Sequence, residues 1–265
     1  MRHPTRHQTI FSSPIRYSVH GEGRPVFLLH GWGANAQAMA PLVTSLAPQH
    51  RVYAIDLPGF GYSPPPPEAW TVQRYAEAIA ELARREGIAE GLAAIGHSFG
   101  GRIALRWAAD PQLRGPLERL VLLSAAGLRP RRTWRYYARR TAAEALKAPL
   151  RMLPELWRDR ALDRLRRSAL WRMLGSRDYR QAHGVMREVL VRTVTDHLDG
   201  LLPQIRLPTL ILWGEQDRVT PLDQAYRLRE GIAGALLHVI PQAGHHLLQD
   251  APKTVCHLVR EFLHS

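Results

Sequence analysis

The stretch LAAIGHSFGGRIALRWAA, residues 92–109, decides the fold. Its first five residues form a short apolar run typical of a buried strand, and residues 99–109 have a helical pattern. Between the two, GHSFG at 96–100 matches the pattern G-x-S-x-G. Such a turn is tight and strained, so glycines flank the serine, whose hydroxyl is presented at the sheet edge beside the helix N-terminus. This context predicts that Ser98 is a nucleophile; the alternative is a glycine-rich turn without chemistry.

The same alternation of apolar runs and helical patterns extends over most of the chain. It predicts an α/β fold with a mostly parallel central sheet flanked by helices on both faces. The expected strands, besides 92–96, are 15–20, 26–30, 52–56, 120–124, 209–213 and 236–240. The expected helices, besides 99–109, are 72–86, 222–231 and 252–264.

The alternation stops between residues 128 and 200. This segment shows Arg- and Leu-rich helical stretches interrupted by prolines, and no apolar strand. We therefore expect a core domain of residues 1–127 and 201–265 with an inserted helical cap at 128–200. The cap has 18 basic and 8 acidic residues, a balance of +10, whereas the rest of the chain, with 18 and 15, has +3.

Composition excludes several classes of protein. The 265 residues are 45% hydrophobic, which supports a full core, and the chain has a single cysteine, Cys256, expected to be a small buried hydrophobe. No apolar run approaches 18 residues, so we expect no membrane span. The basic, polar N-terminus does not resemble a secretory signal, which predicts a cytoplasmic protein. The net charge of +13 is compatible with nucleic acid, an anionic membrane surface or an acidic partner, but no nucleic-acid reader is recognisable.

A serine becomes a good nucleophile only with a base and an acid that orients the base. Asp217 follows the strand at 209–213 and His245 follows the last strand, in the order Ser, Asp, His that this architecture requires. Glu215 competes with Asp217 and is expected to support the turn. His246 competes with His245, and spacing alone does not separate them.

Backbone N–H groups are needed where negative charge develops on the tetrahedral intermediate. We expect them from Phe99, the residue after the nucleophile, and from Trp32, in the loop after the strand at 26–30. Gly31, Trp32 and Phe99 are also the expected substrate-binding residues. Asp196, His197 and Asp199 form a loose cluster that could bind a metal, but without a spaced set of ligands we predict no metal there.

Together these motifs resemble the α/β-hydrolase superfamily over nearly the whole chain. The matching segments are LLHGWG at 28–33, DLPGFGYS at 56–63, the Ser98 elbow and AGH at 243–245. In that family the base commonly precedes an acidic residue by five positions and a proline by seven. Asp250 and Pro252 fit His245 and not His246, so the resemblance selects His245.

The resemblance also orders the candidate reactions. Epoxide hydrolases and haloalkane dehalogenases have an aspartate as nucleophile where this chain has Ser98. The resemblance therefore disfavours those two reactions. Carbon–carbon bond hydrolases typically have Asn before the nucleophile, where this chain has His97. The leading prediction is a serine carboxylesterase acting on small to medium acyl esters under a helical cap, a reaction that implies no metal or organic cofactor. Carbon–carbon bond hydrolysis stays a less favoured alternative, and a binding protein without chemistry is the least favoured. The sequence leaves the oligomeric state open.

Segments 28–33 and 56–61 are also similar to those of the biotin-pathway carboxylesterases, which demethylate an acyl-carrier-protein ester. In those enzymes cap arginines dock the acidic carrier. This chain has a cluster of cap arginines, namely Arg131, Arg132, Arg135, Arg139 and Arg140. An acidic carrier protein is therefore an alternative partner, and thioester hydrolysis an alternative reaction, beside a simple solvated helical surface.

Overall fold

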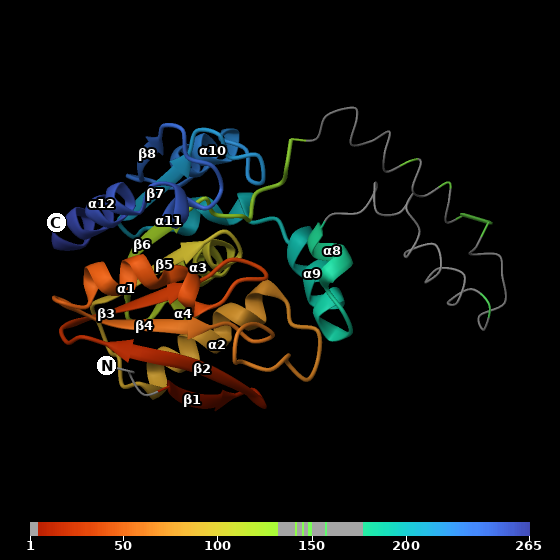
Figure 1. The fold of residues 1–265 in the computed structure, drawn as a ribbon, viewed down its shortest axis with the longest axis horizontal. Helices are drawn as coiled ribbons and strands as arrows, with labels where there is room; N and C mark the ends of the chain where they lie inside the picture. The colour runs from red at the N-terminus through yellow and green to blue at the C-terminus, as the bar shows by residue number, and fades with distance from the viewer. Residues whose placement is uncertain (1–4, 132–140, 142–144, 146–147, 150–156, 158–176) are drawn as a thin grey trace. The chain divides into compact units, whose positions relative to one another are not determined.

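The computed structural model describes residues 5–131, 141, 145, 148–149, 157 and 177–265 (Figure 1). The chain divides into two units, residues 1–129 with 191–265 and residues 130–190. The predicted insertion at 128–200 overlaps the second unit, while residues 191–200 belong to the first. The cluster of cap arginines from Arg132 to Arg140 lies outside the described residues.

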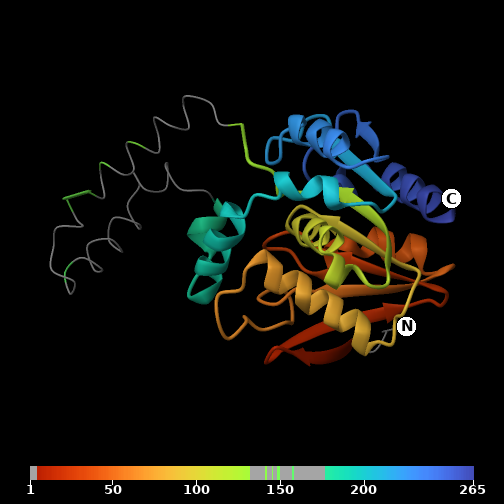
Figure 2. The same ribbon diagram turned by 180° about the vertical axis from the view of Figure 1, so that it is seen from behind.

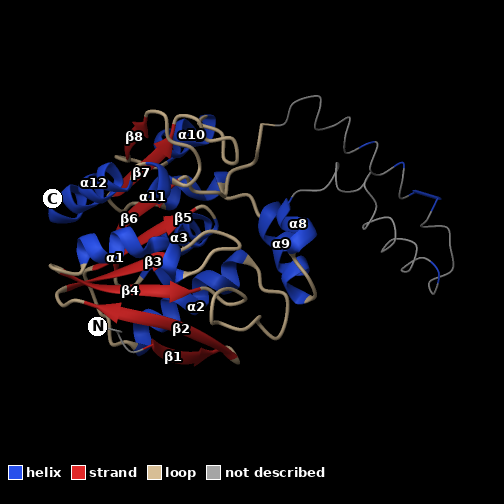
Figure 3. Ribbon diagram, in the orientation of Figure 1, coloured by secondary structure: helices blue, strands red, loops and turns tan. Residues whose placement is uncertain are grey.

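Within the described residues, one sheet of eight strands forms the centre of the first unit (Figure 3). Its spatial order is β1-β2-β4-β3-β5-β6-β7-β8. The strands are β1 (Thr5–Ile10), β2 (Ser13–His20), β3 (Arg24–Leu29), β4 (His50–Asp56), β5 (Leu92–His97), β6 (Leu117–Leu123), β7 (Thr209–Gly214) and β8 (Leu236–Ile240). The pairs β1–β2 and β2–β4 are antiparallel and all others are parallel, so the predicted fold class is confirmed.

Helices cover both faces of this sheet. Helices α1 and α12 pack against each other on one face, and α2 and α3 pack together on the face seen in Figure 2. The described helices are η1 (Ala36–Met39), α1 (Ala40–Leu46), α2 (Val72–Arg85), α3 (Phe99–Ala109), α4 (Pro111–Arg114), α8 (Arg177–Gln181), α9 (Val185–Thr195), η2 (Asp199–Gln204), α10 (Asp223–Gly231), α11 (Leu247–Asp250) and α12 (Pro252–His264). None of the described helices is long and apolar enough to cross a membrane.

Helix α2 shows how local sequence sets these elements. The Thr71 side chain caps its start by accepting a hydrogen bond from the Arg74 N–H at 3.2 Å. Tyr75, Ile79 and Leu82, spaced to share one face, are all fully buried. The helix therefore buries the face that its periodicity predicts.

The order of the strands brings the expected site together. The chain passes from β3 to β4 on one side and later returns to place β5 on the other side of β3. In parallel sheets, a crevice opens at the carboxyl ends of strands where the order reverses in this way. The loops after β3 and β5, which contain Trp32 and Ser98, are thus neighbours at one edge of the sheet.

Strand β1 was not expected from the sequence, because the polar segment 5–10 has no apolar run. It pairs with β2 through a tight hairpin in which Phe11 and Ser12 adopt φ values of 49° and 60°. Such turns are normally recognised by Asn or Gly, which adopt positive φ easily. An edge strand needs only one buried face, and here Ile10 alone is fully buried.

Candidate active site

Ser98 lies at the turn between β5 and α3, with φ 50° and ψ −107°. A non-glycine residue in this region is strained by about 1–3 kcal/mol and persists only where its surroundings hold it. Three main-chain hydrogen bonds do so here, each 3.0 Å long: Ser98 N–H donates to the Leu123 carbonyl, and the Arg102 and Ala126 N–H groups donate to the Ser98 carbonyl. The predicted strained elbow is therefore present at Ser98.

The flanking glycines are required by close backbone contacts. A Cβ at Gly96 would lie 2.5 Å from the carbonyl carbon of Gly100, and one at Gly100 would lie 2.1 Å from the Leu29 carbonyl oxygen. Both distances are far inside van der Waals contact, and the opposing atoms are main chain that cannot turn away. The pattern G-x-S-x-G thus reflects how closely α3 approaches β3 and β5.

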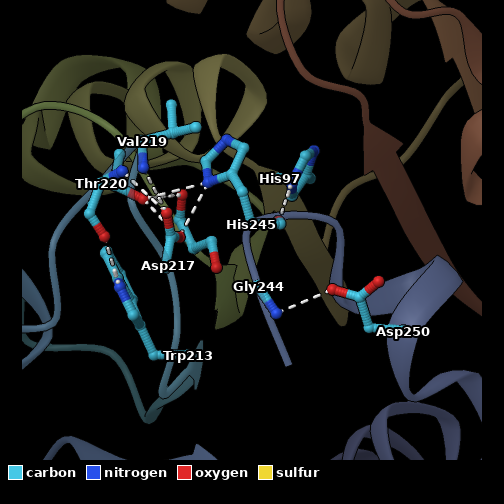
Figure 4. A network of polar contacts seen from close by, with 9 residues as sticks. His97, Trp213, Asp217, Val219, Thr220, Gly244, His245 and Asp250 are labelled. Atoms are coloured by element: carbon cyan, nitrogen blue, oxygen red, sulfur yellow. Dashed lines mark hydrogen bonds and ion pairs between the residues drawn. The ribbon is translucent and has the colours of Figure 1, made fainter. Parts of the chain in front are cut away.

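Asp217 and His245 are brought together from two loops, one after β7 and one after β8 (Figure 4). Asp217 Oδ2 lies 2.8 Å from His245 Nδ1. Because an ionised carboxylate only accepts hydrogen bonds, Nδ1 carries the proton and Nε2 keeps a free lone pair. This is the tautomer in which an imidazole acts as a base through Nε2.

The Asp217 carboxylate is held by its own turn. The N–H groups of Val219 and Thr220 donate to Oδ1 at 2.8 and 2.9 Å, and the Thr220 hydroxyl donates to Oδ2 at 2.8 Å. Burial by itself raises the pKa of the Asp217 carboxyl, but the hydrogen bonds from His245 and Thr220 lower it by more, so the pKa lies below its ordinary value. Asp217 is therefore an ionised acceptor with a single orientation.

Thr220 is a site residue that the sequence analysis missed. Its hydroxyl oxygen also lies 3.2 Å from His245 Nδ1 and 3.2 Å from the Ser124 carbonyl oxygen. The sequence signal for this turn was Asp217 itself, because an Asp side chain often accepts hydrogen bonds from main-chain N–H groups two or three positions later. Only the folded turn shows that the threonine hydroxyl also contacts the histidine.

The two competing residues lie elsewhere in the same loops. Glu215 accepts a hydrogen bond from the Gln242 N–H at 3.2 Å and lies on the surface. His246 is exposed, with its ring 5.4 Å from that of His245. Asp250 Oδ2 accepts a hydrogen bond from the Gly244 N–H at 2.8 Å, which gives a physical reason for an acid five positions after His245.

Trp32 and Phe99 lie in the loops after β3 and β5. In the described part of the chain neither main-chain N–H donates a hydrogen bond, so both are free to bind an anion. Their side chains pack edge to face, with ring centroids 5.3 Å apart, and Phe60 packs on Trp32 at 4.9 Å. The aromatic contacts hold together the two loops that present these amides.

His30 holds the start of the loop that contains Trp32 through hydrogen bonds, a role that the sequence did not predict. The Leu57 N–H donates to His30 Nε2 at 3.0 Å, so Nδ1 carries the proton and donates to the Gly31 carbonyl at 2.8 Å. The ring is buried, and burial lowers its pKa, so it stays neutral. His30 thereby links the end of β4 to the loop after β3.

The Ser98 hydroxyl and the His245 ring are not hydrogen-bonded to each other in the described residues. Such contacts are often long before a substrate binds. The described geometry thus comprises a serine in a strained turn, an imidazole oriented by a carboxylate, and the main-chain N–H groups of Trp32 and Phe99, which donate no hydrogen bond among the described residues.

No group of three or more metal-ligating side chains occurs among the described residues. In the expected loose cluster, the Asp199 carboxylate is engaged by the Arg129 N–H at 2.9 Å and by the Arg227 guanidinium. Cys256 is half-buried, with its thiol donating to the Pro41 carbonyl at 3.4 Å.

The chain is similar to several known hydrolases. A pimeloyl-[acyl-carrier protein] methyl ester esterase of Chromobacterium violaceum is 29% identical over 242 residues, covering 85% of this chain and 88% of that protein. A 2-hydroxy-6-oxononadienedioate/2-hydroxy-6-oxononatrienedioate hydrolase of Cupriavidus pinatubonensis is 26% identical over 292 residues, covering 98% and 95%. Among solved structures, a thermophilic esterase from Thermogutta terrifontis has a TM-score of 0.71 at 24% identity, covering 98% of each chain.

The family model described as the alpha/beta hydrolase fold matches residues 24–252. That range extends from the start of β3 to the first residue of α12 and includes every residue of the site described above. The chain belongs to the α/β-hydrolase family.

Proposed function

We propose that this protein is a serine hydrolase that cleaves carboxylic esters, with Ser98 as nucleophile, His245 as base and Asp217 as the acid that orients the base. The observation that carries the proposal is the 2.8 Å hydrogen bond between Asp217 Oδ2 and His245 Nδ1. The strained Ser98 directly follows His97, whose ring bonds the His245 carbonyl at 2.9 Å. Few purely structural arrangements need a buried carboxylate bonded to an imidazole next to a strained turn.

In the proposed reaction, Ser98 Oγ attacks the ester carbonyl carbon while His245 Nε2 takes the hydroxyl proton. The carbonyl oxygen becomes negative and accepts hydrogen bonds from the N–H groups of Trp32 and Phe99. The bond to the alcohol then breaks, the alcohol oxygen takes the proton from His245, and an acyl-Ser98 remains. Water repeats the sequence with His245 as base, which releases the acid and restores the Ser98 hydroxyl.

Asp217 acts in both halves by holding one tautomer and by stabilising the imidazolium. Its lowered pKa keeps the carboxyl ionised at any pH where His245 works as a base. No step in this sequence requires a cofactor.

The test is Ser98→Ala with p-nitrophenyl esters of increasing acyl length. We expect hydrolysis to fall to the rate of the uncatalysed control, with an unchanged far-UV circular dichroism spectrum. A fluorophosphonate probe should label the wild-type chain and not the variant. Unchanged turnover in Ser98→Ala would refute the mechanism.

A carrier-bound ester is the second candidate substrate, favoured by the basic cap and by the pimeloyl-carrier esterase relative. If an acidic carrier docks through arginines, kcat/KM for a carrier-bound ester or thioester should fall steeply between low and moderate salt. Small free esters are the control and should show a flat salt response. A flat response for both substrates would remove this candidate.

Carbon–carbon bond hydrolysis is the third candidate, since one relative is a hydrolase of that kind. The position before the nucleophile weighs against it. His97 Nε2 lies 2.9 Å from the His245 carbonyl oxygen, so its donor is already engaged by the main chain. A side chain used in this way is not free to donate to a substrate.

A further inference from the structure

His97 is a buried titratable side chain that the proposed reaction does not use. Its Nε2 lies 2.9 Å from the carbonyl oxygen of His245 (Figure 4). A carbonyl oxygen only accepts, so Nε2 carries a proton and donates it. In the neutral ring the other nitrogen, Nδ1, is then unprotonated.

The surroundings of the ring keep it neutral. Burial lowers the pKa of His97 to about 4, and the nearby His245 and His246 lower it further. The hydrogen bond to the His245 carbonyl and, less strongly, Asp217 oppose this lowering. A neutral ring that donates from Nε2 has one tautomer and one orientation. His97 thus makes the same hydrogen bond throughout the neutral pH range.

Three loops of the site meet at this ring. His97 itself belongs to the turn after β5. Its Nδ1 faces the loop after β3, since a Cβ on Gly31 would lie only 2.9 Å away. The loop after β8 contributes the His245 carbonyl and the rings of His245 and His246, 5.0 and 5.9 Å from the His97 ring.

Main-chain hydrogen bonds hold the residues on both sides of His245. Gln216 N–H donates to the Ala243 carbonyl at 2.9 Å, Asp250 binds the Gly244 N–H, and the Gln249 and Asp250 N–H groups donate to the His246 carbonyl at 2.8 and 3.0 Å. Among the described residues, however, the His245 carbonyl accepts a hydrogen bond from His97 and from no other group. Asp217 bonds the ring of His245, whereas His97 bonds its main chain.

We propose that His97 is a positioning residue that holds the His245 main chain at the correct distance from Ser98 and from the oxyanion loop. This inference rests on the proposed function, in which His245 is the base. It assigns the residue before the nucleophile to alignment of the base rather than to contact with the substrate. A neutral donor of fixed length between β5 and the β8 loop is the feature that this role requires.

The test compares three substitutions of His97. In His97→Gln the side-chain amide nitrogen reaches about as far as Nε2, whereas in His97→Asn it stops one atom short, and His97→Leu has no donor. His246→Leu is the matched control, because it removes an exposed ring of the same cluster without removing the hydrogen bond to the His245 carbonyl.

We expect kcat for p-nitrophenyl acetate to fall by about 10- to 100-fold in His97→Asn and His97→Leu, because misplacing a reacting group by about 1 Å has effects of this size. KM should change much less, and His97→Gln should recover most of kcat. A second readout is the downfield proton resonance of His245 Nδ1–H bonded to Asp217. It should be present in the wild type, His97→Gln and His246→Leu, and weakened or shifted in His97→Asn and His97→Leu.

Two results would overturn the proposal: equal kcat in His97→Gln and His97→Asn, or an unchanged resonance in His97→Asn. The His97→Gln and His97→Asn pair is polar and close in size, so it decides the matter even if His97→Leu does not fold. Ser98→Ala separates this from the proposed function. If Ser98→Ala keeps full activity, the reaction assignment fails, while the resonance still decides whether His97 positions His245.

Discussion

Replacing Asp217 by Asn changes one atom of the site and should change the tautomer of His245. The N–H groups of Val219 and Thr220 both point at Oδ1. The Asn carbonyl oxygen therefore occupies the Oδ1 position, since the opposite orientation would set an NH2 group against two N–H donors. The NH2 group then faces His245 Nδ1, at the position where Oδ2 lies 2.8 Å away in the wild type.

An NH2 group cannot accept the Nδ1 proton, so His245 is expected to move its proton to Nε2. The lone pair that takes the Ser98 proton is then lost. The same change of tautomer in serine proteases lowers kcat by about 10⁴-fold. We expect a loss of this order here, which corresponds to about 5.5 kcal/mol of transition-state stabilisation.

The fold should lose much less than the activity. The Thr220 hydroxyl can accept from the new NH2 group and donate to the Ser124 carbonyl, now 3.2 Å away, so no buried donor remains without a partner. The four hydrogen bonds at position 217 then no longer involve a charged carboxylate, which should lower the free energy of unfolding by about 1–3 kcal/mol. The variant should therefore be folded and inactive under the same conditions.

The assay is kcat/KM for p-nitrophenyl acetate, with the free energy of unfolding from urea titration. Glu215→Gln is the matched control, because it removes a carboxylate of the same loop that bonds only the Gln242 main chain in the described structure. It should keep activity within about twofold. Activity in Asp217→Asn within about tenfold of the wild type, or equal losses in the two variants, would refute the assigned role of Asp217.

The pH dependence of stability gives an independent check. The pKa of Asp217 is lower in the folded chain than its ordinary value of about 3.9. Its contribution to stability is thus complete above that value and is lost as the pH falls through the folded pKa. The stability difference between wild type and Asp217→Asn should narrow below about pH 4, and a constant difference down to strongly acidic pH would contradict this linkage.

Three further predictions address the elbow, the choice of base and the anchoring of α9. Gly100→Ala should lower the free energy of unfolding, measured by urea titration, by at least about 1–3 kcal/mol, because its Cβ would lie 2.1 Å from a main-chain oxygen. Gly200→Ala is the control and should be nearly neutral, because the space around Gly200 is open. Equal effects of the two substitutions would contradict the prediction. His245→Ala should abolish ester hydrolysis and His246→Ala should reduce it by less than about tenfold; the reverse order in kinetic assays would move the base to His246. Arg102→Met should lower the thermal unfolding midpoint. The buried Arg102 guanidinium donates to the carbonyls of Thr193 and Asp196, and leaving these carbonyls unpaired costs about 1–3 kcal/mol. An unchanged midpoint would contradict this role and show that water replaces the guanidinium.

The sequence patterns located most of the secondary structure closely. The helix at 99–109 and the strand at 236–240 have the predicted bounds, and the strand at 209–213 extends by one residue. Buried strands and amphipathic helices are readable because burial on one face or both leaves a periodic signal. Strand β1 was not predicted, because a polar edge strand leaves almost no periodic signal in the sequence.

The candidate nucleophile, acid and base were also readable, because each follows an apolar strand within a short motif. Their partners were not. Thr220 and His30 act through hydrogen bonds to residues far along the chain, and a single side chain gives no sign of such a partner. The order β4-β3-β5, which places the Trp32 and Ser98 loops side by side, is likewise absent from local patterns.

The sequence by itself thus determined the class of fold and the residue types of the site, since these depend on local spacing and on which side chains are apolar. Residue spacing alone did not separate His245 from His246; the family resemblance selected His245, and the tertiary structure shows that it is the histidine bonded to Asp217 and shows what His97 binds. His245 and His246 are neighbours with identical chemistry, and the direction in which each ring points is set by the loop after β8. That loop is held by Asp250, by the turn at Asp217 and by the hydrogen bond from His97. Distances of this kind arise from the packing of segments up to 148 residues apart, which no local pattern encodes.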